Sequence, residues 1–169
     1  MKENCCDCGC SCSETKKITI DFLFLDLSVC QRCQGADENL DAAVSEVTSV
    51  LETAGYEIIV NKINITSKEL AVKHEFRSSP TIRVNGIDIM DEVRESGCCD
   101  CGSLCGGSVD CRVFDHEGKQ YTSPPKTMIV NAILKTVYAG APAKRHAPYV
   151  LPENLKEFFD RLEAGRAES

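Results

Sequence analysis

The sequence predicts an α/β fold that carries a cysteine-rich insertion and a C-terminal helical extension. A nearly continuous apolar run, Ile18 to Leu27, is typical of a strand covered on both faces. Apolar residues then recur at helical spacing between Gln31 and Ala54, and Tyr56 to Ile63 has the pattern of a second strand. Because a helix crosses between the two strands, we expect them to be parallel.

The rest of the chain predicts a hairpin and three more helices. A short helix capped by Thr66 or Ser67 is expected to reach about residue 76, and Asn85-Gly86 is typical of a hairpin turn between strands at 81–84 and 87–90. A packing helix is expected near residues 125–139. A final helix from residue 152 to about 164 has one apolar face, which we expect to dock on the domain's own surface; pairing with a second subunit is the alternative.

Charge and hydropathy exclude several function classes. The net charge is -7 without a sustained basic cluster, so neither nucleic acid nor a membrane surface is expected as a partner. No apolar run is long enough for a membrane helix, and the N-terminus lacks the apolar core of a signal peptide. We therefore expect a cytoplasmic protein. The sequence does not indicate its oligomeric state. In a reducing compartment its 12 cysteines favour metal or redox chemistry over disulfide staples.

The pair Cys30 and Cys33 has the Cys-x-x-Cys spacing and lies where the first strand gives way to the helix. The positive end of the helix dipole favours a thiolate, so we expect Cys30 to have a lowered pKa and to be the nucleophile. Arg32 adds positive charge in the same direction if its side chain folds back. Two buried small hydrophobes, or a passive metal clip, are the alternatives.

The order of these elements, with Ser79-Pro80-Thr81-Ile82 after the cysteine pair, resembles the thioredoxin-like superfamily. More narrowly, the motifs are similar to an uncharacterised Cys-x-x-Cys thioredoxin-like family of unknown function. The resemblance implies a thioredoxin-like fold, a cis Pro80 packed against the cysteine pair, a substrate groove beside it, and Cys33 as the resolving thiol. The chain departs from thioredoxin itself at Val29, at Gln31-Arg32, and at Phe24, where a buried carboxylate is expected.

Two further clusters contain the remaining ten cysteines, and Cys98-Cys99-Asp100-Cys101-Gly102 repeats Cys5-Cys6-Asp7-Cys8-Gly9. Clustered thiolates suit zinc, copper(I), mercury, arsenite or, as a weaker expectation, an iron-sulfur cluster, but the spacings in the second cluster match no standard zinc or ferredoxin pattern closely. One explanation of the repeat is that the two clusters converge on one metal site or exchange electrons. A disulfide-stapled insertion and a tail with incidental cysteines are the alternatives. The candidate ligands are Cys5, Cys6, Cys8, Cys10, Cys12, Cys98, Cys99, Cys101, Cys105 and Cys111, with His116 as a weaker one.

These observations divide the chain into a cysteine-rich tail (1–16), a thioredoxin-like domain (17–140) with its insertion at 91–123, and a linker with a C-terminal helix (141–169). The leading hypothesis is an intracellular thiol-disulfide oxidoreductase that works with a protein or small-thiol redox partner. Its proposed site is Cys30 and Cys33 with Arg32 and Pro80. The alternatives are a non-enzymatic thiolate protein for metal sequestration or delivery, and an iron-sulfur electron carrier.

Overall fold

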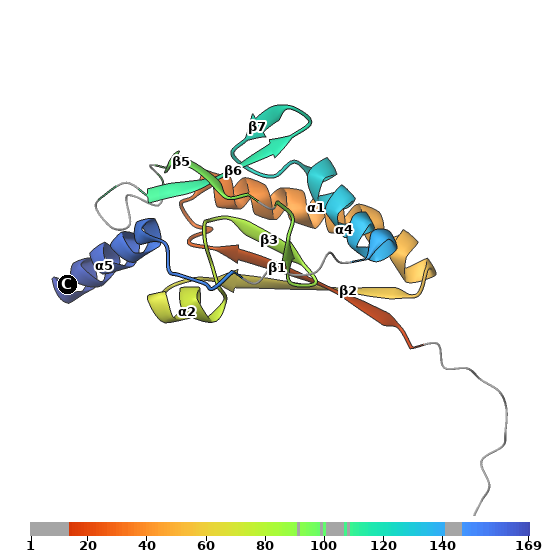
Figure 1. Cartoon of the computed structure of the whole chain (residues 1–169), viewed down its shortest axis with the longest axis horizontal. Helices are drawn as coiled ribbons and strands as arrows, with labels where there is room; N and C mark the ends of the chain where they lie inside the picture. The colour runs from red at the N-terminus through yellow and green to blue at the C-terminus, as the bar shows by residue number, and fades with distance from the viewer. Residues whose placement is uncertain (1–13, 91, 99, 101–106, 108, 141–146) are drawn as a thin grey trace, which may run out of the picture.

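The main sheet of the protein contains both strands that flank the Cys-x-x-Cys helix. Its strand order is β2-β1-β3-β4, with β1 (Lys16–Phe24) parallel to β2 (Tyr56–Asn64). β3 (Thr81–Val84) is antiparallel to β1 and to β4 (Ile87–Asp88), so the α/β class and the parallel pairing are confirmed. Figure 1 shows the computed structural model, which describes residues 14–90, 92–98, 100, 107, 109–140 and 147–169.

Helix α1 (Gln31–Thr53) connects β1 to β2 and packs beside α4 (Lys126–Ala139) (Figure 1). Its apolar positions form one buried stripe, and each fully buried leucine in it stabilises the fold by about 1.5–3 kcal/mol. The helix ends at Thr53, and Gly55 follows its cap residue Ala54 with a φ of 86°, which glycine adopts at little cost. The buried stripe contains Cys33, Ala36, Leu40, Ala43, Val47 and Leu51.

The first strand ends three residues earlier than the sequence predicts, at Phe24 instead of Leu27. The cause is Asp26, whose Oδ1 accepts hydrogen bonds from the backbone N–H groups of Ser28 at 2.6 Å and Val29 at 2.9 Å. A local turn of this kind competes with the sheet for the backbone. It turns the chain toward the start of α1.

Helix α2 (Lys68–Lys73) is also shorter than predicted, although Ser67 caps it as expected. Glu75 adopts a φ of 48°, and the backbone N–H of Phe76 donates to the carbonyl of Ala71 at 2.8 Å. This closing geometry is typical of a helix C-terminus. The fully buried Phe76 therefore lies beyond the helix and anchors the following loop in the core.

The cysteine-rich insertion folds into a small antiparallel sheet of its own, in the order β5-β6-β7. The strands are β5 (Arg94–Cys98), β6 (Val109–His116) and β7 (Lys119–Tyr121). β6 and β7 form a hairpin whose turn residues, Glu117 and Gly118, both have positive φ. In Figure 1 this sheet lies above the helices that cover the main sheet.

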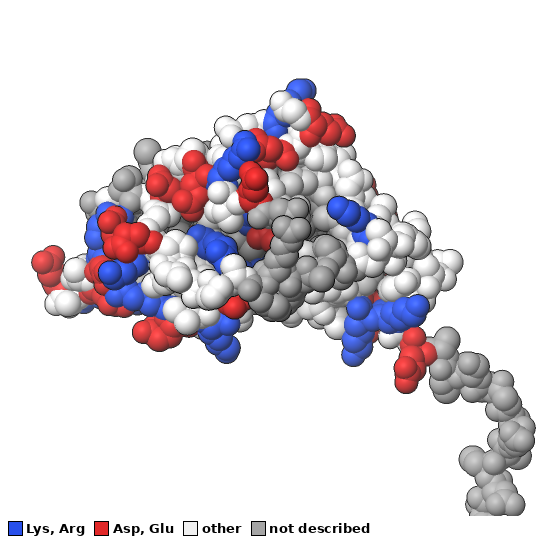
Figure 2. Space-filling model, in the orientation of Figure 1, with Lys and Arg blue, Asp and Glu red and all other residues white. Residues whose placement is uncertain are grey.

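Helix α5 (Glu153–Ala167) docks on the same chain, as predicted. It contacts α2 and β6 and buries Leu155, Phe158 and Phe159. Among the described residues no helix combines the length and the apolar character needed to cross a membrane. On the face drawn in Figure 2, basic and acidic side chains are interspersed over the described surface.

Candidate functional site

Cys30 and Cys33 lie at the start of α1, as the sequence predicts. Cys30 is the N-cap residue, and its Sγ accepts a hydrogen bond from the backbone N–H of Cys33 at 3.4 Å. A negative charge on Cys30 would be stabilised by this donor and by the positive end of the helix dipole. Both side chains are fully buried, which the sequence did not indicate for an attacking thiol.

The loop before β3 contacts the second cysteine. The Ser79 hydroxyl lies 3.2 Å from the Sγ of Cys33 and accepts from the backbone N–H of Leu25 at 3.1 Å. The carbonyl of Ser79 accepts from the backbone N–H of Arg112 at 2.7 Å. The Ser79–Pro80 peptide bond is cis, as the resemblance implies. This loop is therefore fixed to the end of β1 and to β6, with Ser79 facing Cys33.

The insertion lies over the first cysteine. The Sγ atoms of Cys30 and Cys98 and a carboxylate oxygen of Asp100 all lie within 4.8 Å of one another. Asp100 Oδ2 also accepts from the backbone N–H of Gln31 at 3.0 Å. The cysteine pair and the cysteine-rich insertion, which the sequence presented as separate sites, thus meet at the start of α1.

Arg32 binds this insertion through its guanidinium group. One nitrogen donates to the carbonyl of Gly97 at 2.9 Å, and the other donates to the carbonyls of Cys111 at 3.2 Å and Ser96 at 3.4 Å. The planar donor fork of arginine suits several carbonyls at once. Arg32 therefore positions the insertion above the cysteine pair, and its expected electrostatic effect on the Cys30 thiol stays a prediction.

The predicted metal ligands fall into three groups. Cys98 and Cys111 are buried on the paired strands β5 and β6, where Cys111 stands opposite Ser96. His116 instead lies at the far end of β6, with its Nε2 3.3 Å from the Thr127 hydroxyl. Outside the described residues lie Cys5, Cys6, Cys8, Cys10, Cys12, Cys99, Cys101 and Cys105.

Sequence reasoning missed Arg112, a fully buried guanidinium that joins the two sheets. It donates to Asp88 Oδ2 at 2.7 Å, to the Met90 carbonyl at 2.9 Å and to the Thr81 hydroxyl at 3.2 Å. A charge in this environment is tolerated because it is paired and hydrogen-bonded. The available signal was a single arginine between Cys111 and the apolar pair Val113-Phe114 in β6.

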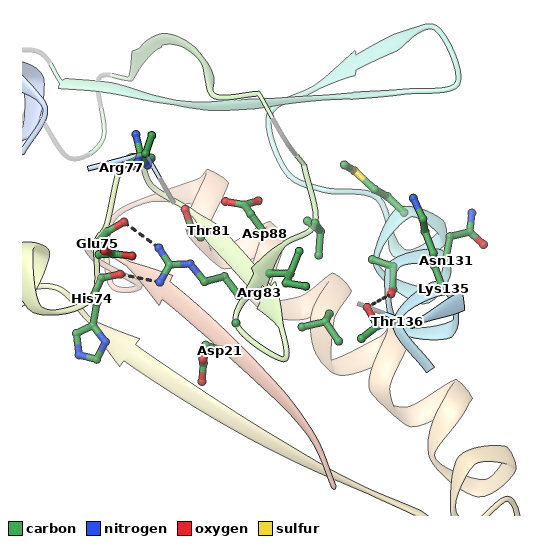
Figure 3. A pocket seen from close by; sticks show the side chains of 18 of the residues that line it. Asp21, His74, Glu75, Arg77, Thr81, Arg83, Asp88, Asn131, Lys135 and Thr136 are labelled. Carbon is green, nitrogen blue, oxygen red and sulfur yellow. Dashed lines mark hydrogen bonds between the residues drawn. The ribbon is translucent and has the colours of Figure 1, made fainter. Parts of the chain in front are cut away.

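An open pocket of about 1220 Å³ lies on another part of the surface, between α2, the β3–β4 hairpin and α4 (Figure 3). The guanidinium of Arg83 donates hydrogen bonds there to the carbonyls of His74 at 2.6 Å and Glu75 at 2.9 Å. Among the described residues the lining includes cations and anions but no cysteine. The pocket is therefore separate from the cysteine site.

The sequence matches, over residues 18–133, a family described as "Domain of unknown function (DUF2703)". The chain belongs to this family. No curated protein and no solved structure matches the chain. The matched segment of this DUF2703 protein includes both cysteines of the pair, the Ser79-Pro80 loop and the strands of the insertion, so the whole described site lies within the family domain.

Proposed function

We propose that this DUF2703 protein is a thioredoxin-like thiol-disulfide oxidoreductase that uses Cys30 and Cys33. The observation that carries the proposal is the placement of the pair: Cys30 caps α1, and Cys33 lies against the Ser79-Pro80 loop with 3.2 Å between Sγ and Oγ. Parallel β1 and β2 joined by α1, with β3 antiparallel beside β1, support the thioredoxin-like assignment.

The reaction proceeds by two exchanges. The Cys30 thiolate attacks one sulfur of a substrate disulfide, forms a mixed disulfide, and releases the other substrate sulfur as a thiolate that takes up a proton. Cys33, deprotonated in its turn, then attacks the sulfur of Cys30, which forms the Cys30–Cys33 disulfide and releases the second substrate thiol. The substrate gains two electrons, and a partner dithiol or two small thiols restore the pair.

Strand β1 places no buried acidic side chain beside the cysteine pair. Phe24 occupies the strand position where thioredoxin-like proteins are expected to place a carboxylate, and its side chain is buried. Asp26 uses Oδ1 in the turn that leads into α1. We propose that Ser79 is the polar group beside Cys33, since its hydroxyl is in hydrogen-bond range of that sulfur.

Burial of Cys30 under Cys98 and Asp100 favours a second candidate function, a thiolate metal-binding protein. In that function the fold is a scaffold, and Cys30 binds a thiophilic ion together with Cys98 and Asp100. Zinc is the leading ion for this mixed donor set. Substrate reduction discriminates the two candidates, because only the exchange function turns over.

Reduction of glutathione disulfide by the full chain, with dithiothreitol as the electron donor and the rate without protein subtracted, tests the proposal. Cys30→Ser should abolish turnover, whereas Cys33→Ser should accumulate a mixed disulfide between Cys30 and glutathione, seen as an added glutathione mass on the tryptic peptide 18–32. That peptide contains Cys30 and no other cysteine, because trypsin cleaves after Lys17 and Arg32. Ser78→Ala, which removes a buried hydroxyl outside the cysteine pair, is the control and should keep both exchange steps. Turnover that survives Cys30→Ser contradicts the proposal.

A further inference from the structure

We propose that Cys30, Cys98 and Asp100 form a zinc site that caps the nucleophile of the cysteine pair. Two sulfurs and one carboxylate oxygen converge there, each pair of ligand atoms within 4.8 Å. In a tetrahedral zinc site the ligand sulfurs lie about 3.8 Å apart, given zinc–sulfur bonds of about 2.3 Å. Movement of about 1 Å is therefore sufficient to close the three ligands around an ion.

The start of α1 and the β5–β6 ladder together hold the three ligands. The start of α1 fixes Cys30, and the β5–β6 ladder fixes Cys98, which stands opposite Val109. Asp100 is oriented by its hydrogen bond from the Gln31 backbone N–H at 3.0 Å. Ligands whose partners outside the metal shell already orient them bind metal more tightly. The ligand geometry thus depends on the contact between the insertion and α1.

The donor set selects the class of ion. Two thiolates with one carboxylate suit zinc, which accepts both sulfur and oxygen ligands, whereas copper(I) and mercury prefer purely soft sites. Three protein ligands leave the fourth position of a tetrahedral ion for a water or a small thiol. The burial of Cys30 and Cys98 excludes bulk water from the sulfur side of the site.

Zinc at this site would hold Cys30 as a metal-bound thiolate and keep it from attacking a disulfide. The regulatory part of this inference rests on the proposed exchange function. When zinc is removed, the Cys30 thiolate is released to attack a substrate disulfide, and Cys33 then resolves the mixed disulfide. The site therefore links thiol chemistry to the zinc supply, with the insertion as the element that delivers two of the ligands.

The test measures alkylation of Cys30 by iodoacetamide in the full reduced chain, with zinc sulfate or after treatment with a chelator. Peptide 18–32 reports Cys30 alone, so metal bound by the other clusters does not contribute to the reading. We expect zinc to slow modification at least about tenfold in the wild type and in Cys33→Ser, which removes a neighbouring thiol outside the site. Asp100→Asn, which keeps an oxygen to accept from Gln31, and Cys98→Ser should lose most of this protection.

Equal rates with and without zinc in the wild type overturn the inference, as does full protection in both Asp100→Asn and Cys98→Ser. A cobalt(II) titration of the same proteins provides the second measurement. The sulfur-to-cobalt charge-transfer absorption should fall in Cys98→Ser relative to the wild type, and an unchanged spectrum also overturns the inference. Zinc protection of Cys30 in a protein that reduces no disulfide would contradict the exchange function but not the metal site.

Discussion

The hydroxyl of Ser79 lies 3.2 Å from the Sγ of Cys33, although 46 residues separate them in the chain. The same hydroxyl accepts from the backbone N–H of Leu25, so it joins the end of β1 to the cysteine pair. Ser79 is fully buried, which strengthens its polar contacts and makes the loss of either costly.

Ser79→Ala should slow the resolving step of Cys33, because it removes the polar group beside that sulfur. The loss of one hydrogen bond of about 1 kcal/mol corresponds to roughly a fivefold slower release of substrate from the mixed disulfide. Rapid-quench analysis of the Cys30 adduct measures this step. Ser78→Ala, which removes a neighbouring buried hydroxyl, is the control. Equal rates in the two variants would contradict the role of Ser79.

Arg32→Lys should expose Cys30. Lysine keeps the charge but lacks the donor fork that binds the carbonyls of Ser96, Gly97 and Cys111. Loss of about 1.5–3 kcal/mol of charge-assisted hydrogen bonding should speed alkylation of Cys30 by roughly tenfold or more in chelator-treated protein. Trypsin also cleaves after lysine, so peptide 18–32 remains the readout in this variant. An unchanged rate would show that Arg32 does not hold the insertion in place.

The same insertion contains the matched control for this variant. Arg94 lies on β5, but its guanidinium forms an exposed ion pair with Asp115 at 2.9 Å. Exposed pairs contribute about 0–1 kcal/mol, so Arg94→Lys should leave the alkylation rate of Cys30 close to that of the wild type.

Asp88→Asn should lower the free energy of unfolding by about 3 kcal/mol, because it leaves the buried Arg112 guanidinium without its counter-charge. Urea denaturation of the reduced protein measures the change. Asp115→Asn, which breaks the exposed pair with Arg94, should cost less than about 1 kcal/mol. Similar losses in both variants would mean that Arg112 does not depend on Asp88.

Gly35→Ala should destabilise the protein even though alanine is the better helix former. A Cβ atom at residue 35 would lie 2.7 Å from the Ser123 hydroxyl, which donates to the Arg32 carbonyl at 2.9 Å. Overpacking typically costs about 1–3 kcal/mol, more than the gain in helix propensity of about 0.8–1.0 kcal/mol. Thermal unfolding measures the balance, and adding Ser123→Gly should relieve the clash.

Gly165→Ala provides the control for that variant, since nothing lies within 4 Å of the added Cβ in α5. In this variant only the higher helix propensity of alanine changes stability, so the melting temperature should rise. A rise in both single variants would show that Ser123 yields to the new methyl group without cost.

The elements that carry the cysteine pair could be predicted from the sequence, because their signals are local. The apolar stripe of α1, the glycine at its end and the Asn85-Gly86 turn each depend on neighbouring residues. Ser67 could likewise be recognised as a cap. The errors lie at element ends, where the side chain of Asp26 and the buried Phe76 redirect the backbone.

The assembly of the site could not be predicted, because it depends on contacts between distant segments. The hydrogen bond from Gln31 to Asp100 joins residues 69 positions apart, and no local pattern encodes it. The repeated Cys-Cys-Asp-Cys-Gly motif marked Cys98 and Asp100 as unusual but gave no indication that they cover Cys30. Arg112 was missed for the same reason, since its partners Thr81 and Asp88 lie in the other sheet.

The central claim, that Cys30 and Cys33 exchange electrons as a pair, is tested most directly by a non-reducing tryptic map of chelator-treated protein equilibrated in glutathione redox buffers. Since trypsin cleaves between the two cysteines, their disulfide joins peptides 18–32 and 33–62 into a single species. The account predicts that this species forms and disappears reversibly as the buffer is made more oxidising or more reducing. A Cys30 that stays reduced throughout, or that links only to peptide 95–112 of the insertion, would contradict it.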